Sequence, residues 1–208
     1  VIRGPREGFI ENMRNNVTLL RRKIHHPDFH VDTVRLGRYT RTDIALVYIS
    51  SIVNKDVLQK LRKRLEAIDI DSVLDSGYIE QFIQDTPYSL FPTIGTAEKP
   101  DIAAAKILEG RIAIIVDGSP IALTVPMLFV EGMQSPEDYY TRFSYASWIR
   151  FIRSIALFIS VFLPGLFVAV CCFHQQVIPF RLFLSIAAAE SNTPFSVGFS
   201  LLIIGLAY

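Results

Sequence analysis

The sequence predicts an α/β domain, a mixed sheet with packed helices, followed by α-helical membrane segments. The distribution of charge supports this division. Of the 21 Lys and Arg residues only Arg181 lies beyond residue 153, and of the 20 Asp and Glu residues only Glu190 does. Residues 1–153 alternate apolar runs of strand length with amphipathic helical patterns. Residues 154–173 contain no Asp, Glu, Lys or Arg over a length that crosses a bilayer core.

The first elements of the domain alternate between helix and strand. An apolar pattern with helical spacing ends in Arg21, Arg22 and Lys23, which suit the negative end of a helix dipole. A later apolar run is continuous and typical of a strand buried on both faces, and Asn54 can cap the helix after it. The predicted elements are a helix over 8–23, a strand over 31–39, a buried strand over 44–49, a helix over 55–67, a short strand over 68–74 and a helix over 76–84.

A loop rich in Pro and Gly separates these elements from a helix and a hairpin. Asp101 is expected to cap a helix that runs to Glu109, and Gly110 to end it. A second buried strand is predicted over 111–116. Asp117-Gly118-Ser119-Pro120 forms a turn pattern between two apolar runs, so residues 121–125 are predicted to be the hairpin partner.

A new helix start precedes the uncharged segment. Ser135 can cap it, Pro136 fits the first helical position, and Glu137 and Asp138 favour the positive end of the dipole. We therefore expect a truncated N-terminal subdomain over 1–39, a cytoplasmic α/β subdomain over 40–134, a juxtamembrane helix over 135–153 and truncated membrane-embedded helices over 154–208. The chain opens without Met and ends inside an apolar run, which favours a fragment.

The uncharged segment predicts a membrane helix interrupted near its middle. Pro164 removes a helix hydrogen bond and Gly165 follows it, so we expect either a kinked span or two half-helices that turn back. A buried helix of a soluble protein is the alternative. Arg142, Arg150 and Arg153 precede the span, and the positive-inside tendency places that side in the cytoplasm.

The residues after this span are apolar but short. Residues 182–189 cannot cross a bilayer, and their small side chains permit close helix packing. Glu190 would mark a pore, a water-filled cavity or a partner if it lay in lipid, and the alternative is a helix end at the headgroups. Pro164, Gly165 and Glu190 are the candidate residues for gating or assembly.

The sequence contains no catalytic motif that predicts an enzyme. It lacks a Walker-type phosphate loop, a Gly-x-Gly-x-x-Gly run and a His-Glu-x-x-His pair, and it predicts no cofactor. The net charge of +1 favours no nucleic-acid partner. Residues 4–8 could hold an anion but are more typical of a turn. His25, His26 and His30 lie near Asp28 and Asp32, a spacing that could hold a metal, but they are more typical of a solvated loop.

Short motifs follow one another along the chain in a fixed order. They comprise Gly4-Pro5-Arg6-Glu7, Ile68 to Leu74, Gly110-Arg111, Asp117-Gly118-Ser119-Pro120, Glu137-Asp138-Tyr139, Arg150 with Arg153, and Leu163-Pro164-Gly165. In this order and spacing they resemble the GerA family of spore germination proteins, specifically its A-type subunit. The resemblance covers residues 1 to about 195, and the tail after Phe195 departs from the family pattern.

The resemblance implies a subunit of a nutrient (germinant) receptor in the inner membrane of the spore, with its N-terminal domain in the cytoplasm. It implies B-type and C-type receptor subunits as partners, a homo-oligomer of A subunits and contact with membrane lipid. It also implies a channel-like or assembly role for the membrane part, and no enzymatic activity. A transporter or permease component is the alternative, and a membrane-tethered enzyme with a polar cleft is a third hypothesis.

Overall fold

The computed structural model describes residues 5–85, 89, 91–135, 138, 140–174, 176, 179, 184–185, 188, 198–200, 203 and 205. The predicted site residues Gly4, Glu137, Tyr139 and Glu190 lie outside this set. The chain divides into two compact units, Val1–Thr141 and Arg142–Tyr208. Each unit is described by itself.

The first unit is built on a five-stranded sheet. The strands are β1 (Phe29–Leu36), β2 (Thr42–Ile49), β3 (Gly95–Ala97), β4 (Ile112–Val116) and β5 (Ala122–Val125), and their spatial order is β1-β2-β4-β5-β3. The predicted α/β class, a sheet with packed helices, is confirmed. All four pairings among the described strands are antiparallel, whereas a mixed sheet was expected. Strands β3 and β4 run in the same direction across a helical crossover, but the hairpin strand β5 lies between them.

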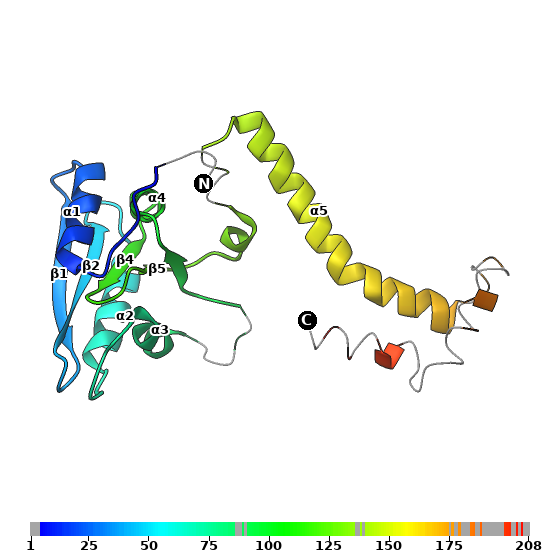
Figure 1. Ribbon diagram of the computed structural model, residues 1–208, viewed down its shortest axis with the longest axis horizontal. Coiled ribbons are helices and arrows are strands. Elements are labelled where there is room, and N and C mark those ends of the chain that lie inside the picture. The colour runs from blue at the N-terminus through cyan, green and yellow to red at the C-terminus, as the bar shows by residue number, and fades with distance from the viewer. Residues whose placement is uncertain are drawn as a thin grey trace. The chain divides into compact units, whose positions relative to one another are not determined.

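Four helices cover the two faces of this sheet. Helices α1 (Met13–Lys23) and α4 (Pro100–Leu108) pack on one face, while α2 (Lys55–Glu66) and α3 (Ser76–Ile83) pack on the other (Figure 1). Side chains of β2 alternate between the two cores because successive residues of a strand point to opposite faces. Ile44, Leu46 and Tyr48 join the α2/α3 core. Ala45, Val47 and Ile49 join the α1/α4 core, which explains why β2 is apolar without interruption from Ile44 to Ile49.

The two cores differ in the size of their side chains. The sheet contributes Ala45, Ala113 and Ala122 to the α1/α4 face, and α4 meets them with Ala103 and Ala104. The opposite face is filled mainly by Ile, Leu and Val. Small residues let a helix approach the sheet closely, whereas branched residues fill the wider space under α2 and α3.

Several predicted boundaries were wrong, each because a local interaction replaced the expected one. Helix α1 begins at Met13 and not at Gly8, because the Asn12 side chain accepts a hydrogen bond from Asn15 N and caps the helix there. Helix α4 follows Lys99, so Asp101 lies inside its first turn and is not its cap. Residues 68–74 form no strand. Their carbonyls instead accept hydrogen bonds from the β1–β2 turn, with Arg38 N to Ile70 O at 3.0 Å.

The second unit contains one long helix, α5 (Phe143–Val168), followed by a π-helical turn over Ala169–Phe173. Among the described residues, one helix, Phe143–Cys171, is long and apolar enough to cross a membrane, and none of its apolar window is buried. It begins at Phe143 and not at the predicted Ser135. Ser135 and Asp138 exchange hydrogen bonds, Asp138 N to Ser135 O at 3.0 Å and Ser135 N to Asp138 Oδ2 at 3.2 Å.

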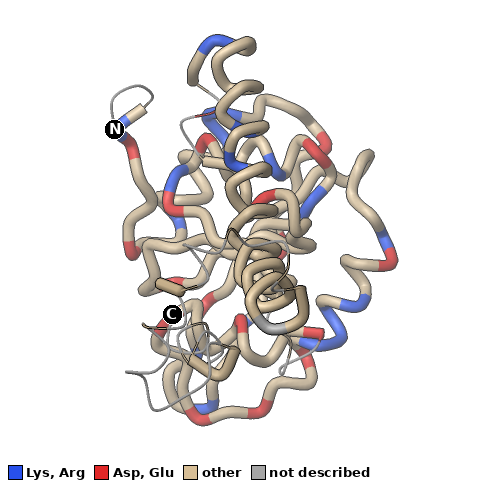
Figure 2. The backbone as a smooth tube through the Cα atoms, turned by 90° about the vertical axis from the view of Figure 1, so that its right-hand side faces the viewer, with Lys and Arg blue, Asp and Glu red and all other residues tan. Residues whose placement is uncertain are grey.

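The charge pattern distinguishes the two units. Lys, Arg, Asp and Glu occur throughout the first unit (Figure 2). Helix α5 carries only Arg150 and Arg153, both near its N-terminal end. The first unit therefore has the surface of a water-exposed domain, whereas most of α5 has the composition of a lipid-exposed one.

Two glycines with positive φ provide a matched test of the packing around α4. Gly110 (φ +88°) ends α4, and a Cβ there would lie 2.7 Å from the Ile52 carbonyl oxygen. Gly118 (φ +90°) has a similar backbone conformation, but a Cβ there would lie 3.7 Å from Leu74 O, an ordinary van der Waals distance. Gly118→Ala should cost roughly 1–2 kcal/mol for the backbone alone, and Gly110→Ala should cost clearly more. The thermal unfolding midpoints of both variants check this, and equal shifts would contradict it.

Candidate functional site

A largely buried ion-pair cluster joins the α/β core to the chain that leads toward α5. Its members are Lys106 from α4, Arg111 at the start of β4 and Glu131 from the 3-10 turn η1 (Phe129–Met133). Glu131 Oε2 lies 3.0 Å from Lys106 Nζ, and Glu131 Oε1 pairs with Arg111 Nη1. The three side chains are between 10% and 16% exposed. We call this group the Glu131 cluster.

The cluster holds the carboxylate in its ionised form. Burial alone would raise the pKa of Glu131. The hydrogen bond from Leu128 N and the pairing with Arg111 and Lys106 outweigh burial, so the pKa of Glu131 is held below its ordinary value. Lys106 also donates to Thr124 Oγ1 at 3.1 Å, so the cluster ties α4, β4, β5 and η1 together. A buried charge that lost these partners would be strongly destabilising.

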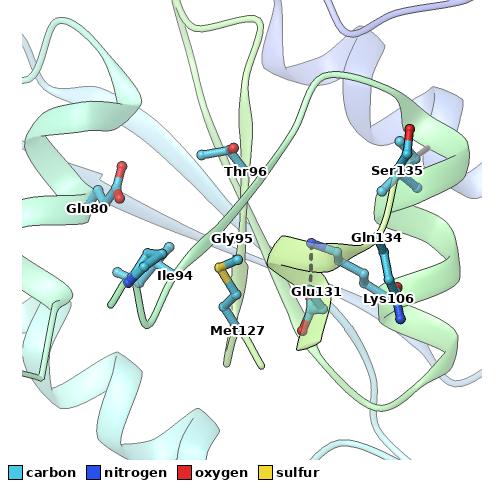
Figure 3. A pocket seen from close by; sticks show the side chains of 11 residues that line it. Glu80, Ile94, Gly95, Thr96, Lys106, Met127, Glu131, Gln134 and Ser135 are labelled. Atoms are coloured by element: carbon cyan, nitrogen blue, oxygen red, sulfur yellow. Dashed lines mark ion pairs between the residues drawn. The ribbon is translucent and has the colours of Figure 1, made fainter. Parts of the chain in front are cut away.

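A cavity of about 400 Å³ lies beside the edge strand β3 and reaches the cluster (Figure 3). It is lined by Glu80 on one side, Ile94 and Met127 in the middle, and Lys106 with Glu131 on the other. Both charges of the Lys106–Glu131 pair are already engaged. A carboxylate held ionised between two cations is poorly suited to exchange protons near neutral pH. Within the described part of the chain, no three metal-ligating side chains converge.

The extended segment that follows the predicted first motif contacts the Asp117-Gly118 turn. Residues 5–12 run along the end of the sheet as a strap, and Phe9 N donates to Glu98 O at 2.9 Å. Gly118 N donates to Glu11 O at 2.8 Å, and Asp117 Oδ1 accepts from Met13 N at 3.0 Å. Asp117 thus satisfies a free amide at the start of α1, although the two residues are far apart in sequence.

Asn16 holds the strap in place through two hydrogen bonds to the backbone of Ile10. It is fully buried, its Oδ1 accepts from Ile10 N at 2.9 Å, and its Nδ2 donates to Ile10 O. One amide side chain therefore satisfies both backbone groups of a residue that belongs to no helix or strand. These bonds explain why the residues before Met13 are extended and not helical.

The other predicted positions are distributed over both units. Pro5 and Arg6 lie on the strap, and Glu7 pairs with Arg22 at 3.8 Å on the exposed surface. Pro120 is exposed in the β4–β5 turn, and Asp138 is buried. Arg150, Arg153, Pro164 and Gly165 lie on α5. The structure therefore brings together the strap with Asp117 and Gly118, and it places Arg111 in the Glu131 cluster.

Pro164 lies inside a helix that continues past it. Helix α5 is unbroken from Phe143 to Val168, so a single helix and not a pair of half-helices accounts for these residues. Proline still lacks the N–H that would bond the carbonyl four residues earlier, that of Ser160. The backbone changes to π-helical geometry at Ala169, and His174 N donates to Ala169 O at 3.2 Å. A missing backbone hydrogen bond and a π-helical turn thus lie within the same apolar segment.

Sequence reasoning did not single out Lys106 or Glu131. Each is a lone charge within an apolar stretch, Lys106 in IAAAKIL and Glu131 in LFVEGM. Such isolated charges are a signal for a buried pair, because an unpaired charge there would be costly. Their separation in sequence gave no indication that they pair with each other.

Asn16 and Asn15 allow a matched test of the strap. Asn16→Asp replaces the donor to Ile10 O with a carboxylate and should cost roughly 1–3 kcal/mol. Asn15→Asp, on the exposed face of the same helix, should change stability by less than about 0.5 kcal/mol. Hydrogen exchange at the Ile10 amide should accelerate in the first variant only. Similar exchange in both variants would show that Asn16 does not hold the strap.

The Glu131 cluster predicts a pH dependence of stability. Because the pKa of Glu131 is lower in the folded chain than its ordinary 4.5, its stabilisation is present above pH 4.5 and is lost as pH falls through the folded pKa. Glu131→Gln should remove roughly 3 kcal/mol at neutral pH, together with this part of the acid dependence. Hydrogen exchange of β4 amides across this pH range measures both effects. An unchanged acid profile in the variant would exclude Glu131 as its source.

Comparisons with known proteins identify the family. The family described as Bacillus/Clostridium GerA spore germination protein matches residues 1–208. Spore germination protein KA of Bacillus subtilis (strain 168) is 49% identical over 193 residues, which are 93% of this chain and 36% of that protein. The membrane protein YfkQ of the same organism is 41% identical over 207 residues, 100% of this chain and 40% of that protein.

A solved structure is also similar to the first part of the chain. The N-terminal domain of the A subunit of the Bacillus megaterium spore germinant receptor GerK3 is 48% identical, with a TM-score of 0.48. The match covers 59% of this chain and 98% of that domain. The chain spans 36% and 40% of the lengths of KA and YfkQ. The resemblance predicted from the motifs is confirmed: the chain belongs to the GerA family of spore germination proteins.

Proposed function

We propose that this chain is part of the A-type membrane subunit of a nutrient (germinant) receptor that triggers spore germination. Membership of the GerA family supports a role in germination. The observation that carries the membrane role is α5, an apolar helix of spanning length whose side chains are exposed, directly after a folded α/β unit. A soluble protein would have to bury these side chains, whereas a lipid environment accepts them.

The proposed location is the inner membrane of the spore, with the unit Val1–Thr141 in the cytoplasm. Arg142, Arg150 and Arg153 lie at the end of α5 that adjoins this unit, and positive charge favours the cytoplasmic side. Tyr145 and Trp148 are exposed at the same end, where aromatic side chains suit the headgroup layer.

The membrane part would assemble or gate, and the cytoplasmic unit would couple to it. The B-type and C-type receptor subunits and further A subunits are the proposed partners. Pro164 and Gly165 are the proposed positions at which α5 bends, because the carbonyl freed by proline weakens the helix there. Glu190 remains a proposed pore or partner contact. The Glu131 cluster, with each charge paired, supports a coupling role and not a catalytic one.

The decisive experiment measures nutrient-triggered dipicolinate release from spores. Deleting the full-length gene, in a strain that lacks the other receptor genes, should abolish release to one class of nutrients, and the gene should restore it. Val161→Lys should fail to restore it, because a lysine near the middle of a membrane helix costs about 2.5–3.5 kcal/mol. Ser147→Lys, at the arginine-rich end of the same helix, is the matched control and should restore release.

The outcomes separate the functions. Unchanged release after deletion would refute the receptor role and favour the transporter alternative. Restoration by Val161→Lys at normal protein level would show that α5 does not cross the membrane.

A further inference from the structure

The turn η1 exposes consecutive large apolar side chains. Leu128, Phe129 and Val130 are 56%, 58% and 59% exposed, although they lie in a water-exposed unit. Phe91 is 63% exposed and packs edge-on against Phe129, with ring centroids 5.5 Å apart. We call these four residues the apolar patch. Contiguous exposed apolar side chains on a folded domain mark an interaction surface.

The Glu131 cluster determines which way this turn faces. Glu131, the charged residue of η1, points inward to Lys106 and Arg111 and accepts from Leu128 N at 2.6 Å. Glu131 N donates in turn to Leu128 O at 2.9 Å. The polar part of the turn is therefore directed into the core and the apolar part toward the outside. The patch is held in place by hydrogen bonds and carries no charge of its own.

The position of the patch along the chain limits what can cover it. Met133 ends η1 and Phe143 begins α5, so nine residues separate them. Nine residues reach at most about 30 Å when fully extended. If α5 inserts in a membrane, the last residue of η1, which closely follows Val130 of the patch, is therefore tethered in every copy of the chain within about 30 Å of Phe143, the first residue of that helix.

We propose that the apolar patch binds the headgroup layer of the membrane that holds α5, so that the first unit has a second, non-spanning membrane contact. This inference depends on the membrane insertion proposed for α5. Aromatic and aliphatic side chains without charge suit the boundary between headgroups and acyl chains, where such contacts are about 5–10 Å deep. We assign the patch to lipid because the short connection to α5 keeps it near the membrane in every copy of the chain. Contact with a second copy would in addition require the chains to associate.

The single tryptophan of the chain makes the test direct. The native protein, with Trp148 alone, reports whether α5 is in the bilayer. A variant with Trp148→Phe and Phe129→Trp reports the patch. The 208-residue chain is reconstituted in phosphatidylcholine vesicles whose acyl chains carry bromine at a shallow or a deep position. Bromine quenches tryptophan emission by contact, so we expect loss of emission for both proteins. For the patch variant, shallow bromine should quench more strongly than deep bromine.

A matched variant controls for non-specific contact. Tyr39 is 84% exposed in the β1–β2 turn, and Trp148→Phe with Tyr39→Trp should show no quenching. Quenching of Trp148 without quenching at position 129 would overturn the patch inference and leave the membrane role of α5 intact. Absence of quenching at Trp148 would refute the insertion on which both rest. Equal quenching at positions 39 and 129 would show indiscriminate adsorption and overturn the inference.

Dilution distinguishes lipid from a second copy of the chain. Contact with lipid predicts that quenching at position 129 is unchanged as the lipid-to-protein ratio rises. Burial between copies predicts a blue-shifted emission that is not quenched by bromine and returns to that of an exposed tryptophan on dilution. The second result would assign the patch to an interface between copies and overturn the lipid assignment.

Discussion

Strands β2 and β4 are packed by helices on both faces, and the architecture of the first unit depends on this double burial. Their alternating side chains supply two cores at once, one beneath α1 and α4 and one beneath α2 and α3. Neither strand tolerates a shift of one residue, because such a shift would move every side chain to the opposite face, and the face beneath α1 and α4 is richer in alanine than the other. The positions of the turns and helix ends around the sheet follow from that fixed register.

Two sets of polar interactions hold the strap and η1, the less regular parts of the chain, against this sheet. At the N-terminal side of the unit, Asn16 and Gly118 bind the backbone of the strap, so that the residues before α1 remain extended. At the exit, Glu131 binds Lys106 and Arg111 and holds η1 in place. Asn16 is fully buried and bonds a residue six positions away, whereas Gly118 and Glu131 bond groups that are distant in the sequence. The latter bonds are therefore sensitive to any movement of α4 or the β4–β5 turn.

The Glu131 cluster also determines which side chains of η1 face the solvent. Glu131, the charged residue of η1, pairs with Lys106 and Arg111, so the exposed side chains of the turn are apolar. The turn precedes the apolar helix α5 by a short length of chain. A unit that contacted the membrane through this turn and was also joined to a membrane helix would be constrained in orientation at the membrane surface. Such a constraint would let a movement within the unit act on α5, which a flexible tether would not permit.

The sequence by itself determined the elements whose cause is local. The uninterrupted apolar runs predicted β2 and β4, Asn54 predicted the start of α2, and the loss of charge after residue 153 predicted the apolar helix. The ordered motifs predicted the family. Tertiary structure alone decided that β5 lies between β3 and β4, that α5 begins at Phe143, and that Glu131 meets Lys106 and Arg111. These features depend on contacts between residues far apart in the chain or on competition between local interactions. The periodicity of apolar residues within a single segment predicts neither.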